Sequence, residues 1–277
     1  MFTDKTIGIV GVGNMGEVLL RGLLAAETSD RAHLLATEIL PDRRAFITDN
    51  YGVEVGKNNV EMAKRCDILV LAVKPQYIDK VLLELVEVVN EKILLVSIAA
   101  GITTGHIASF FPGTEVRIIR VMPNAPALVL RGAAALYPGL HATEEDLTLA
   151  RGIFETTGRT VVVQGEELMD VVTGLSGSGP AFVFMMIEAL SDAGVQLGLS
   201  RKVSNLLAAQ TVYGAAKMFL ETGRHASELK DLVATPGGTT FAGMRALEKG
   251  IFRSTVMDAV EAASHKSAEL GKKKQSG

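Results

Sequence analysis

A glycine-rich loop near the start of the chain places the strongest limit on its fold. In "IGIVGVGNMG" (residues 7–16), Gly11, Gly13 and Gly16 directly follow a short apolar run and directly precede a helical segment. In that context the spacing is typical of a dinucleotide-binding turn: the first glycine permits the tight turn, the second lets the backbone approach a pyrophosphate, and the third lets the helix pack on the strand. The sequence therefore predicts a strand–turn–helix unit with a pyrophosphate at the helix N-terminus.

Short apolar runs continue to alternate with helical segments up to about residue 165. The runs rich in Val, Ile and Leu are predicted strands, and the segments between them carry apolar residues at three- and four-residue intervals. The predicted strands cover 5–10, 33–38, 66–73, 92–99, 115–122 and 159–164. "TEED" at 143–146 resembles a capping box and predicts a helix start at Thr143. This alternation predicts a doubly wound α/β domain with a parallel sheet covered on both sides.

Beyond residue 166 the strand pattern stops. Helices are predicted at 181–198, 201–223, 225–235, 239–250 and 252–271. We therefore expect an α/β N-terminal Rossmann-type domain over residues 1–166 and an all-α C-terminal domain over residues 167–277. The helix that starts at Pro180 is apolar on nearly every side, and a domain of about a hundred residues buries such a helix with difficulty. A homodimer through the helical domain is predicted, and a monomer that covers this helix itself is the alternative.

Composition and charge exclude several classes of protein. A formal net charge of −3 over 277 residues, without a basic stripe, argues against a nucleic-acid partner. The single cysteine, Cys66, excludes an intramolecular disulfide framework and fits a reducing compartment. The five histidines are scattered, so no metal site is expected. The apolar stretches read as too short to cross a bilayer and the N-terminus does not resemble a secretory signal, so we expect a cytoplasmic protein without a membrane partner.

The nature of the dinucleotide is left open by the residues after the second strand. Glu38 lies about twenty residues beyond Gly16, where a carboxylate can accept hydrogen bonds from the adenosine ribose and would repel a 2′-phosphate. Arg43 and Arg44 follow and could bind that phosphate, although they could equally form a solvated charged face. Both NADH and NADPH therefore remain possible cofactors.

Further small-residue loops supply candidates for the substrate. "AVKP" at 72–75 and "SIAAG" at 97–101 end strands and leave room for a cofactor ring. "GLSGSGP" at 174–180 and "ATPGGTT" at 234–240 each place Gly, Ser or Thr ahead of a helix, where N–H groups and hydroxyls can bind a carboxylate. A close helix crossing explains "GLSGSGP" equally well, whereas "ATPGGTT" exposes more backbone than a simple turn needs.

Five motifs in order along almost the whole chain resemble the pyrroline-5-carboxylate reductase family. They are "GVGNMG", "LAVKPQ", "IRVMPNAPALV", "TGLSGSGPAF" and "LKDLVATPGGTTFAGMRALE", and the last two are highly specific to that family. The resemblance implies hydride transfer from NADPH or NADH to the C=N bond of a cyclic imino acid, which gives L-proline. It also implies a helical dimerisation domain and assembly as a homodimer or a ring of dimers.

The resemblance assigns roles by position. It implies that the catalytic hydroxyl belongs to Thr240, which would hydrogen-bond the substrate nitrogen as it accepts a proton. The implied substrate-binding residues are Glu166, Ser178, Thr235, Gly237, Gly238, Thr239 and Thr240. The implied cofactor-binding residues are Gly11, Val12, Gly13, Asn14, Met15, Gly16, Glu38, Asn59, Ala72, Val73, Lys74, Pro75, Ile98, Ala99 and Ala100.

The chain departs from the family pattern at a few positions. Thr235 replaces a frequent serine, and Ala125, Leu130 and Arg131 stand where the family usually has threonine, glycine and glutamate. One rival interpretation is a 3-hydroxyacid-type dehydrogenase, which would need a lysine proton donor in the helical domain. The other is a non-catalytic nucleotide-sensing protein, which measurable turnover would exclude.

Overall fold

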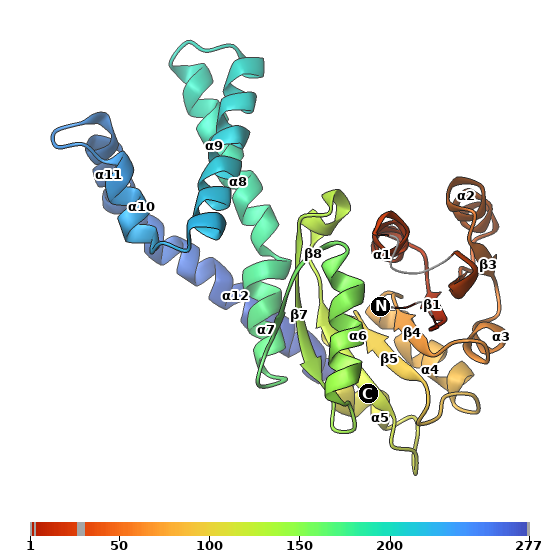
Figure 1. Cartoon of the computed structure of the whole chain (residues 1–277). Coiled ribbons are helices and arrows are strands. Elements are labelled where there is room, and N and C mark those ends of the chain that lie inside the picture. The colour runs from red at the N-terminus through yellow and green to blue at the C-terminus, as the bar shows by residue number, and fades with distance from the viewer. Residues whose placement is uncertain (1, 3, 27–30, 276–277) are drawn as a thin grey trace. The chain divides into compact units, whose positions relative to one another are not determined.

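The computed structural model of the chain describes residue 2, residues 4–26 and residues 31–275 (Figure 1). Eight strands form one sheet in the order β3-β2-β1-β4-β5-β6-β7-β8. The strands are β1 (Ile7–Val10), β2 (Leu34–Thr37), β3 (Glu54–Gly56), β4 (Ile68–Leu71), β5 (Leu94–Ser97), β6 (Arg117–Met122), β7 (Gly132–Pro138) and β8 (Gly158–Val162). The first six strands run parallel, as expected for a Rossmann-type sheet.

Strands β1, β2, β4 and β5 are buried on both faces, and their side chains alternate between two apolar clusters. Ile68 and Val70 of β4 belong to one cluster, and Leu69 and Leu71 belong to the other. The first cluster includes α1 (Asn14–Ala25), α2 (Pro41–Tyr51) and α6 (Glu144–Glu155), and the second includes α3 (Asn59–Ala63), α4 (Ile78–Leu85) and α5 (Thr104–Ala108). This period-two alternation explains why the strands read as continuous apolar runs.

Local signals account for the ends of several elements. The Thr143 hydroxyl accepts a hydrogen bond from Asp146 N, and the Asp146 carboxylate accepts one from Thr143 N, so the predicted capping box is present. Gly52 ends α2 in the left-handed conformation, with φ 65°. Three short helical turns complete this part of the chain: η1 (Arg31–His33), η2 (Pro75–Tyr77) and η3 (Ala125–Val129).

Two strands were not predicted, and the sheet is not parallel throughout. β3 has only three residues and lies at the edge of the sheet, so it carries no apolar run. β7 pairs antiparallel with β6 because the connection at residues 123–131 is too short for a crossover helix. β8 then pairs parallel with β7, so the last two strands run against the first six.

The chain beyond β8 is helical, as predicted. α7 (Leu168–Val172) leads through a π-helical turn, η4 (Thr173–Gly177), into α8 (Gly179–Gln196). The remaining helices are α9 (Arg201–Thr222), α10 (Ala226–Val233), α11 (Thr239–Lys249) and α12 (Phe252–Gln275). Ser200 caps α9 with its side chain and Gly223 ends it with φ 63°, which accounts for the observed length.

The contacts divide the chain into two compact units. Unit 1 comprises Met1–Gly177 together with Ala262–Gly277, and unit 2 comprises Ser178–Glu261. The end of α12 therefore belongs to unit 1, where Ser267 donates a hydrogen bond to Asp170 of α7 at 2.6 Å. The domain boundary expected between residues 166 and 167 stays a prediction.

One expectation about apolar segments needs correction. The continuous helical stretch Leu168–Gln196 is long and apolar enough to cross a membrane, judged by length and composition alone. The sequence did not predict a helical stretch of this length, because Gly and Ser residues at 174–179 indicated a break between two helices. In the structure the π-helical turn η4 instead connects α7 to α8.

Candidate functional site

The predicted cofactor-binding residues lie at one edge of the sheet. Each of these residues either follows the carboxyl end of a parallel strand or lies at the start of the next helix. Backbone hydrogen bonds also connect the loops that follow neighbouring strands. Gly11 N donates to Thr37 O at 2.9 Å, and Ala72 N donates to Val10 O at 2.9 Å. This is the edge at which open α/β sheets bind nucleotides.

The loop between β1 and α1 has the shape of a phosphate cradle. Gly11 has φ 90°, which favours glycine, and a Cβ on Gly16 would overlap the Gly11 carbonyl oxygen. A Cβ on Gly13 would meet no atom within 4 Å, so the backbone there is open to a ligand. Gly13 is the N-cap of α1 and has no side-chain cap, so the first N–H groups of the helix suit an anion. The residues present therefore fit a dinucleotide pyrophosphate.

The loop after β2 holds Glu38 in a defined position. One oxygen of its carboxylate, Oε1, accepts hydrogen bonds from Ile39 N at 2.8 Å and Leu40 N at 3.1 Å. Arg44 donates from Nη1 to the carbonyls of Glu38 and Ile39, at 2.8 and 2.9 Å. The carboxylate is thus fixed at the end of β2. Its second oxygen, Oε2, takes no part in these bonds, and a residue that accepts hydrogen bonds from a ribose needs such an oxygen.

Arg43 contacts the glycine loop directly. Its Nε donates to the Val12 carbonyl at 2.8 Å, and its Nη2 pairs with Glu17 of α1. The Tyr51 hydroxyl donates to the other Glu17 oxygen at 2.6 Å. Sequence reasoning gave Glu17 and Tyr51 no role, and no local pattern links them, because they lie 34 residues apart.

The remaining predicted cofactor residues line the same edge. Asn59 begins α3, where its Oδ1 accepts from the Thr37 hydroxyl at 2.6 Å and its Nδ2 donates to Glu84 at 2.7 Å. Ala72, Val73, Lys74 and Pro75 follow β4, and Ile98, Ala99 and Ala100 follow β5. Lys74 is exposed and Ala99 is buried.

The predicted substrate loop is a compact turn in unit 2. Gly238 N donates to Thr235 O at 2.9 Å, and Gly237 between them has φ 70°. Pro236 before that glycine fits a type II turn. Gly238 then caps α11 without a side-chain bond, so the first N–H groups of that helix suit an anion. Thr240 donates its hydroxyl to the Val233 carbonyl at 3.1 Å, which joins the two ends of the loop.

Glu166 is held within unit 1. Its Oε1 accepts from Thr104 N at 2.7 Å and pairs with Arg120 Nη1 at 3.1 Å, and its Oε2 accepts from the Thr104 hydroxyl at 2.9 Å. Arg120 is only 5% exposed, so this carboxylate compensates a buried charge. Ser178 lies at the start of unit 2 and makes no side-chain cap for α8.

Asn124 is a further polar residue that sequence reasoning did not single out. It follows β6, and its Nδ2 donates to the carbonyl and hydroxyl oxygens of Ser176, at 3.3 and 3.1 Å. Its Oδ1 accepts from Ala133 N at 2.8 Å. Asn124 therefore joins "MPNAP" to "GLSGSG", and because Asn124 and Ser176 lie 52 residues apart, only the fold reveals this link.

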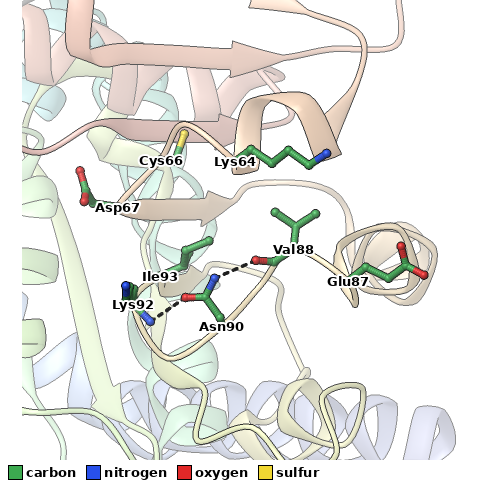
Figure 2. A pocket seen from close by; sticks show the side chains of 8 residues that line it. All are labelled: Lys64, Cys66, Asp67, Glu87, Val88, Asn90, Lys92 and Ile93. Atoms are coloured by element: carbon green, nitrogen blue, oxygen red, sulfur yellow. Dashed lines mark hydrogen bonds between the residues drawn. The ribbon is translucent and has the colours of Figure 1, made fainter.

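A surface cavity of about 400 Å³ lies at the opposite edge of the sheet (Figure 2). It is lined by Lys64, Cys66, Asp67, Glu87, Val88, Asn90, Lys92 and Ile93. Asp67 and Ile93 immediately precede β4 and β5, so the cavity faces away from the glycine loop. Burial raises the pKa of the Cys66 thiol to about 12, which keeps it protonated and inert at neutral pH.

Comparison with known protein families matches both parts of the chain. Residues 6–101 match the model described as "NADP oxidoreductase coenzyme F420-dependent". Residues 166–270 match the model described as "Pyrroline-5-carboxylate reductase dimerisation". The first match lies within the predicted dinucleotide-binding part, and the second covers most of the predicted helical part.

Curated relatives match over almost their full length. The chain is 44% identical to pyrroline-5-carboxylate reductase of Methanosarcina acetivorans, over 98% of this chain and 99% of the relative. It is 41% identical to the enzyme of that name from Escherichia coli, over 97% of this chain and 99% of the relative.

Solved structures agree with the curated relatives. A pyrroline-5-carboxylate reductase from Coxiella burnetii superposes with a TM-score of 0.92 at 37% identity, covering 96% of this chain and 98% of that one. The Plasmodium falciparum pyrroline carboxylate reductase, solved with NADP bound, has a TM-score of 0.84 at 34% identity, covering 97% and 98%.

Proposed function

Because the chain belongs to the pyrroline-5-carboxylate reductase family, we propose a role in its reaction for each of the two loops described above. The protein is an NAD(P)H-dependent oxidoreductase that reduces 1-pyrroline-5-carboxylate to L-proline, the last step of proline biosynthesis. In our proposal the edge formed by Gly11 to Gly16, Glu38, Asn59, residues 72–75 and residues 98–100 binds the dinucleotide. The turn at residues 235–240 binds the substrate.

The N-terminus of α11, which has no side-chain cap, is the observation that carries the substrate assignment. Its N–H groups follow a Pro-Gly-Gly turn and can bind the carboxylate of a cyclic imino acid. Thr235 and Thr239 add hydroxyls to the same short segment. The proposed substrate set also includes Ser178 and Glu166, and Glu166 pairs with Arg120 as well.

Thr240 is proposed to assist proton transfer. When bound, the reduced nicotinamide supplies the hydride to the imine carbon, and the imine nitrogen must then hold a proton. The Thr240 hydroxyl can turn from the Val233 carbonyl to hydrogen-bond that nitrogen, directly or through water. Orientation of the substrate by the loop supplies most of the acceleration.

NADH is the proposed preferred cofactor. The fixed Glu38 carboxylate suits two ribose hydroxyls and repels a 2′-phosphate. Both arginines that could bind the phosphate already donate to backbone carbonyls, Arg43 to Val12 and Arg44 to Glu38 and Ile39.

Self-association follows from the family, whose helical part is a dimerisation domain. We propose a homodimer through unit 2, or a ring of such dimers, in the cytoplasm, with no membrane or nucleic-acid partner. The apolar side chains that α8 exposes support this proposal, because a second chain would cover them.

The proposed substrate site is tested by Thr240→Ala. We expect kcat with 1-pyrroline-5-carboxylate to fall about 100-fold, as loss of a proton-transfer group does, while the Kd for the dinucleotide changes less than about twofold. Thr240→Ser should recover most of the activity because it restores the hydroxyl.

Thr222→Ala is the matched control, since Thr222 ends α9 and its hydroxyl bonds only to nearby backbone, donating to the Met218 carbonyl and accepting from Arg224 N. That variant should keep wild-type kinetics. A Thr240→Ala enzyme with wild-type kcat, or one that loses dinucleotide binding, would show that Thr240 does not act on the substrate.

A further inference from the structure

Three side chains join the first two helices of the dinucleotide-binding part. Arg43 of α2 reaches across to Glu17 of α1 and to the Val12 carbonyl in the glycine loop. Tyr51, at the other end of α2, donates to the same Glu17 carboxylate. The side chains of Arg43 and Glu17 are 25% and 22% exposed, so this ion pair is shielded from water more than a surface pair is.

The carboxylate of this group stays ionised at neutral pH. Burial raises the pKa of Glu17, but hydrogen bonds from Tyr51 and Arg43, together with the charges of Arg43 and Arg21, hold the pKa below its usual range. The hydrogen bond to Glu17 and burial raise the pKa of Tyr51, so the phenol remains a donor. Arg43 therefore faces a permanent negative charge.

The position of Arg43 makes this pair relevant to the cofactor. Arg43 lies in the first turn of α2, directly after the loop that carries Glu38. A guanidinium at this place is well suited to bind a 2′-phosphate bidentately. Arg43 instead has its Nε on Val12 and its Nη2 on Glu17, so two of its donor groups are engaged.

We propose that Glu17 determines the cofactor preference of this enzyme by engaging Arg43 and so withholding its guanidinium from a 2′-phosphate. The inference rests on the proposed function, in which the loop after β2 holds the adenosine ribose. Glu17 acts through Arg43 and is a positioning residue. The preference for NADH then has two causes: repulsion by Glu38 at the ribose, and neutralisation of the nearby cation by Glu17.

Glu17→Gln tests this inference by titration of NADH and NADPH binding through their fluorescence, without substrate. The variant keeps a side chain that can hydrogen-bond Tyr51 and removes the charge that holds Arg43. We expect the ratio of the Kd for NADPH to the Kd for NADH to fall at least tenfold. Glu17→Ala removes any residual contact with Arg43 and should lower the ratio at least as far.

Two comparisons separate the proposed coupling from a general effect of charge. Asp49→Asn removes one negative charge from the exposed surface of α2 and should leave the ratio unchanged. In an Arg43→Ala background, Glu17→Gln should also leave the ratio unchanged, because the released cation is no longer present.

Three results would overturn the inference. An unchanged ratio in Glu17→Gln and Glu17→Ala would show that Arg43 does not reach the 2′-phosphate. An equal loss of affinity for both dinucleotides would make Glu17 only a structural support of the glycine loop. Wild-type protein that binds neither dinucleotide would overturn the proposed site itself, and the inference with it.

Discussion

At the scale of single residues, backbone conformation accounts for two unusual positions. Leu130 and Ile251 have φ of 55° and 49°, and they are the non-glycine residues in the left-handed region within the described part of the chain. Leu130 stands where the resemblance implies glycine. Ile251 follows the C-terminus of α11, and its β-branched side chain is 68% exposed. Both positions cost conformational energy that a glycine would avoid.

Ile251→Gly should stabilise the protein. Relief of the left-handed strain is worth about 1–2 kcal/mol, and the added freedom of glycine in the unfolded chain costs about 0.5–1 kcal/mol. We therefore expect the free energy of unfolding in urea to rise by about 0.5–1 kcal/mol, measured at a fixed protein concentration.

Ala246→Gly is the control in the same region, because it should lower the free energy of unfolding. Ala246 is exposed within α11, so glycine there should lower the free energy of unfolding by about 1 kcal/mol. If Ile251→Gly were destabilising too, the left-handed backbone at Ile251 would not be strained.

At the scale of elements, Glu166 connects the entry of the helical stretch to the sheet. It lies two residues before α7, and its partners belong to β6 and to the first turn of α5. Because Arg120 is buried, the pair is a support of the fold in its own right. If Glu166 supports the fold, its substitution should change stability; if it contacts the substrate, its substitution should change KM.

Glu166→Gln should lower the free energy of unfolding by roughly 2 kcal/mol, because a hydrogen-bonded charge pair loses its anion. If the residue acts only as a support, the KM for 1-pyrroline-5-carboxylate should change less than about twofold in the folded enzyme. Glu167→Gln, at an exposed neighbour, is the control and should change stability by less than about 0.5 kcal/mol. A large rise in KM without loss of stability would assign Glu166 to the substrate instead.

At the scale of the whole molecule, the helical part exposes more apolar surface than a monomer of this kind usually does. On α8, the side chains of Phe184 and Met185 are 64% and 69% exposed in the single chain, and Leu206 on α9 is 68% exposed. The family match to a dimerisation model and this exposure lead to the same conclusion, that unit 2 is made to associate.

Met185→Asp should weaken that association. A charge placed within an apolar interface has no partner, so we expect the dimer dissociation constant to rise at least tenfold, measured by light scattering across a range of concentrations. Gln196→Asp adds the same charge at the exposed end of the same helix and should leave the oligomer intact. Wild-type protein that sediments with lipid vesicles instead of self-associating would assign the apolar surface to a membrane.

The sequence by itself determined most of the elements and the family. The glycine spacing, the apolar runs and the helical periodicity are local properties, so the dinucleotide turn, most strands and every helix from α8 to α12 could be predicted from them. The tertiary structure alone decided the antiparallel pairing of β7 with β6 and the presence of the short edge strand β3. Strand pairing depends on the length of the connection and on neighbouring strands, which no local sequence pattern records.

The tertiary structure also decided the partners of the polar side chains. Glu17 meets Arg43 across 26 residues and Glu166 meets Arg120 across 46, and contacts between residues so far apart form only when the chain is folded.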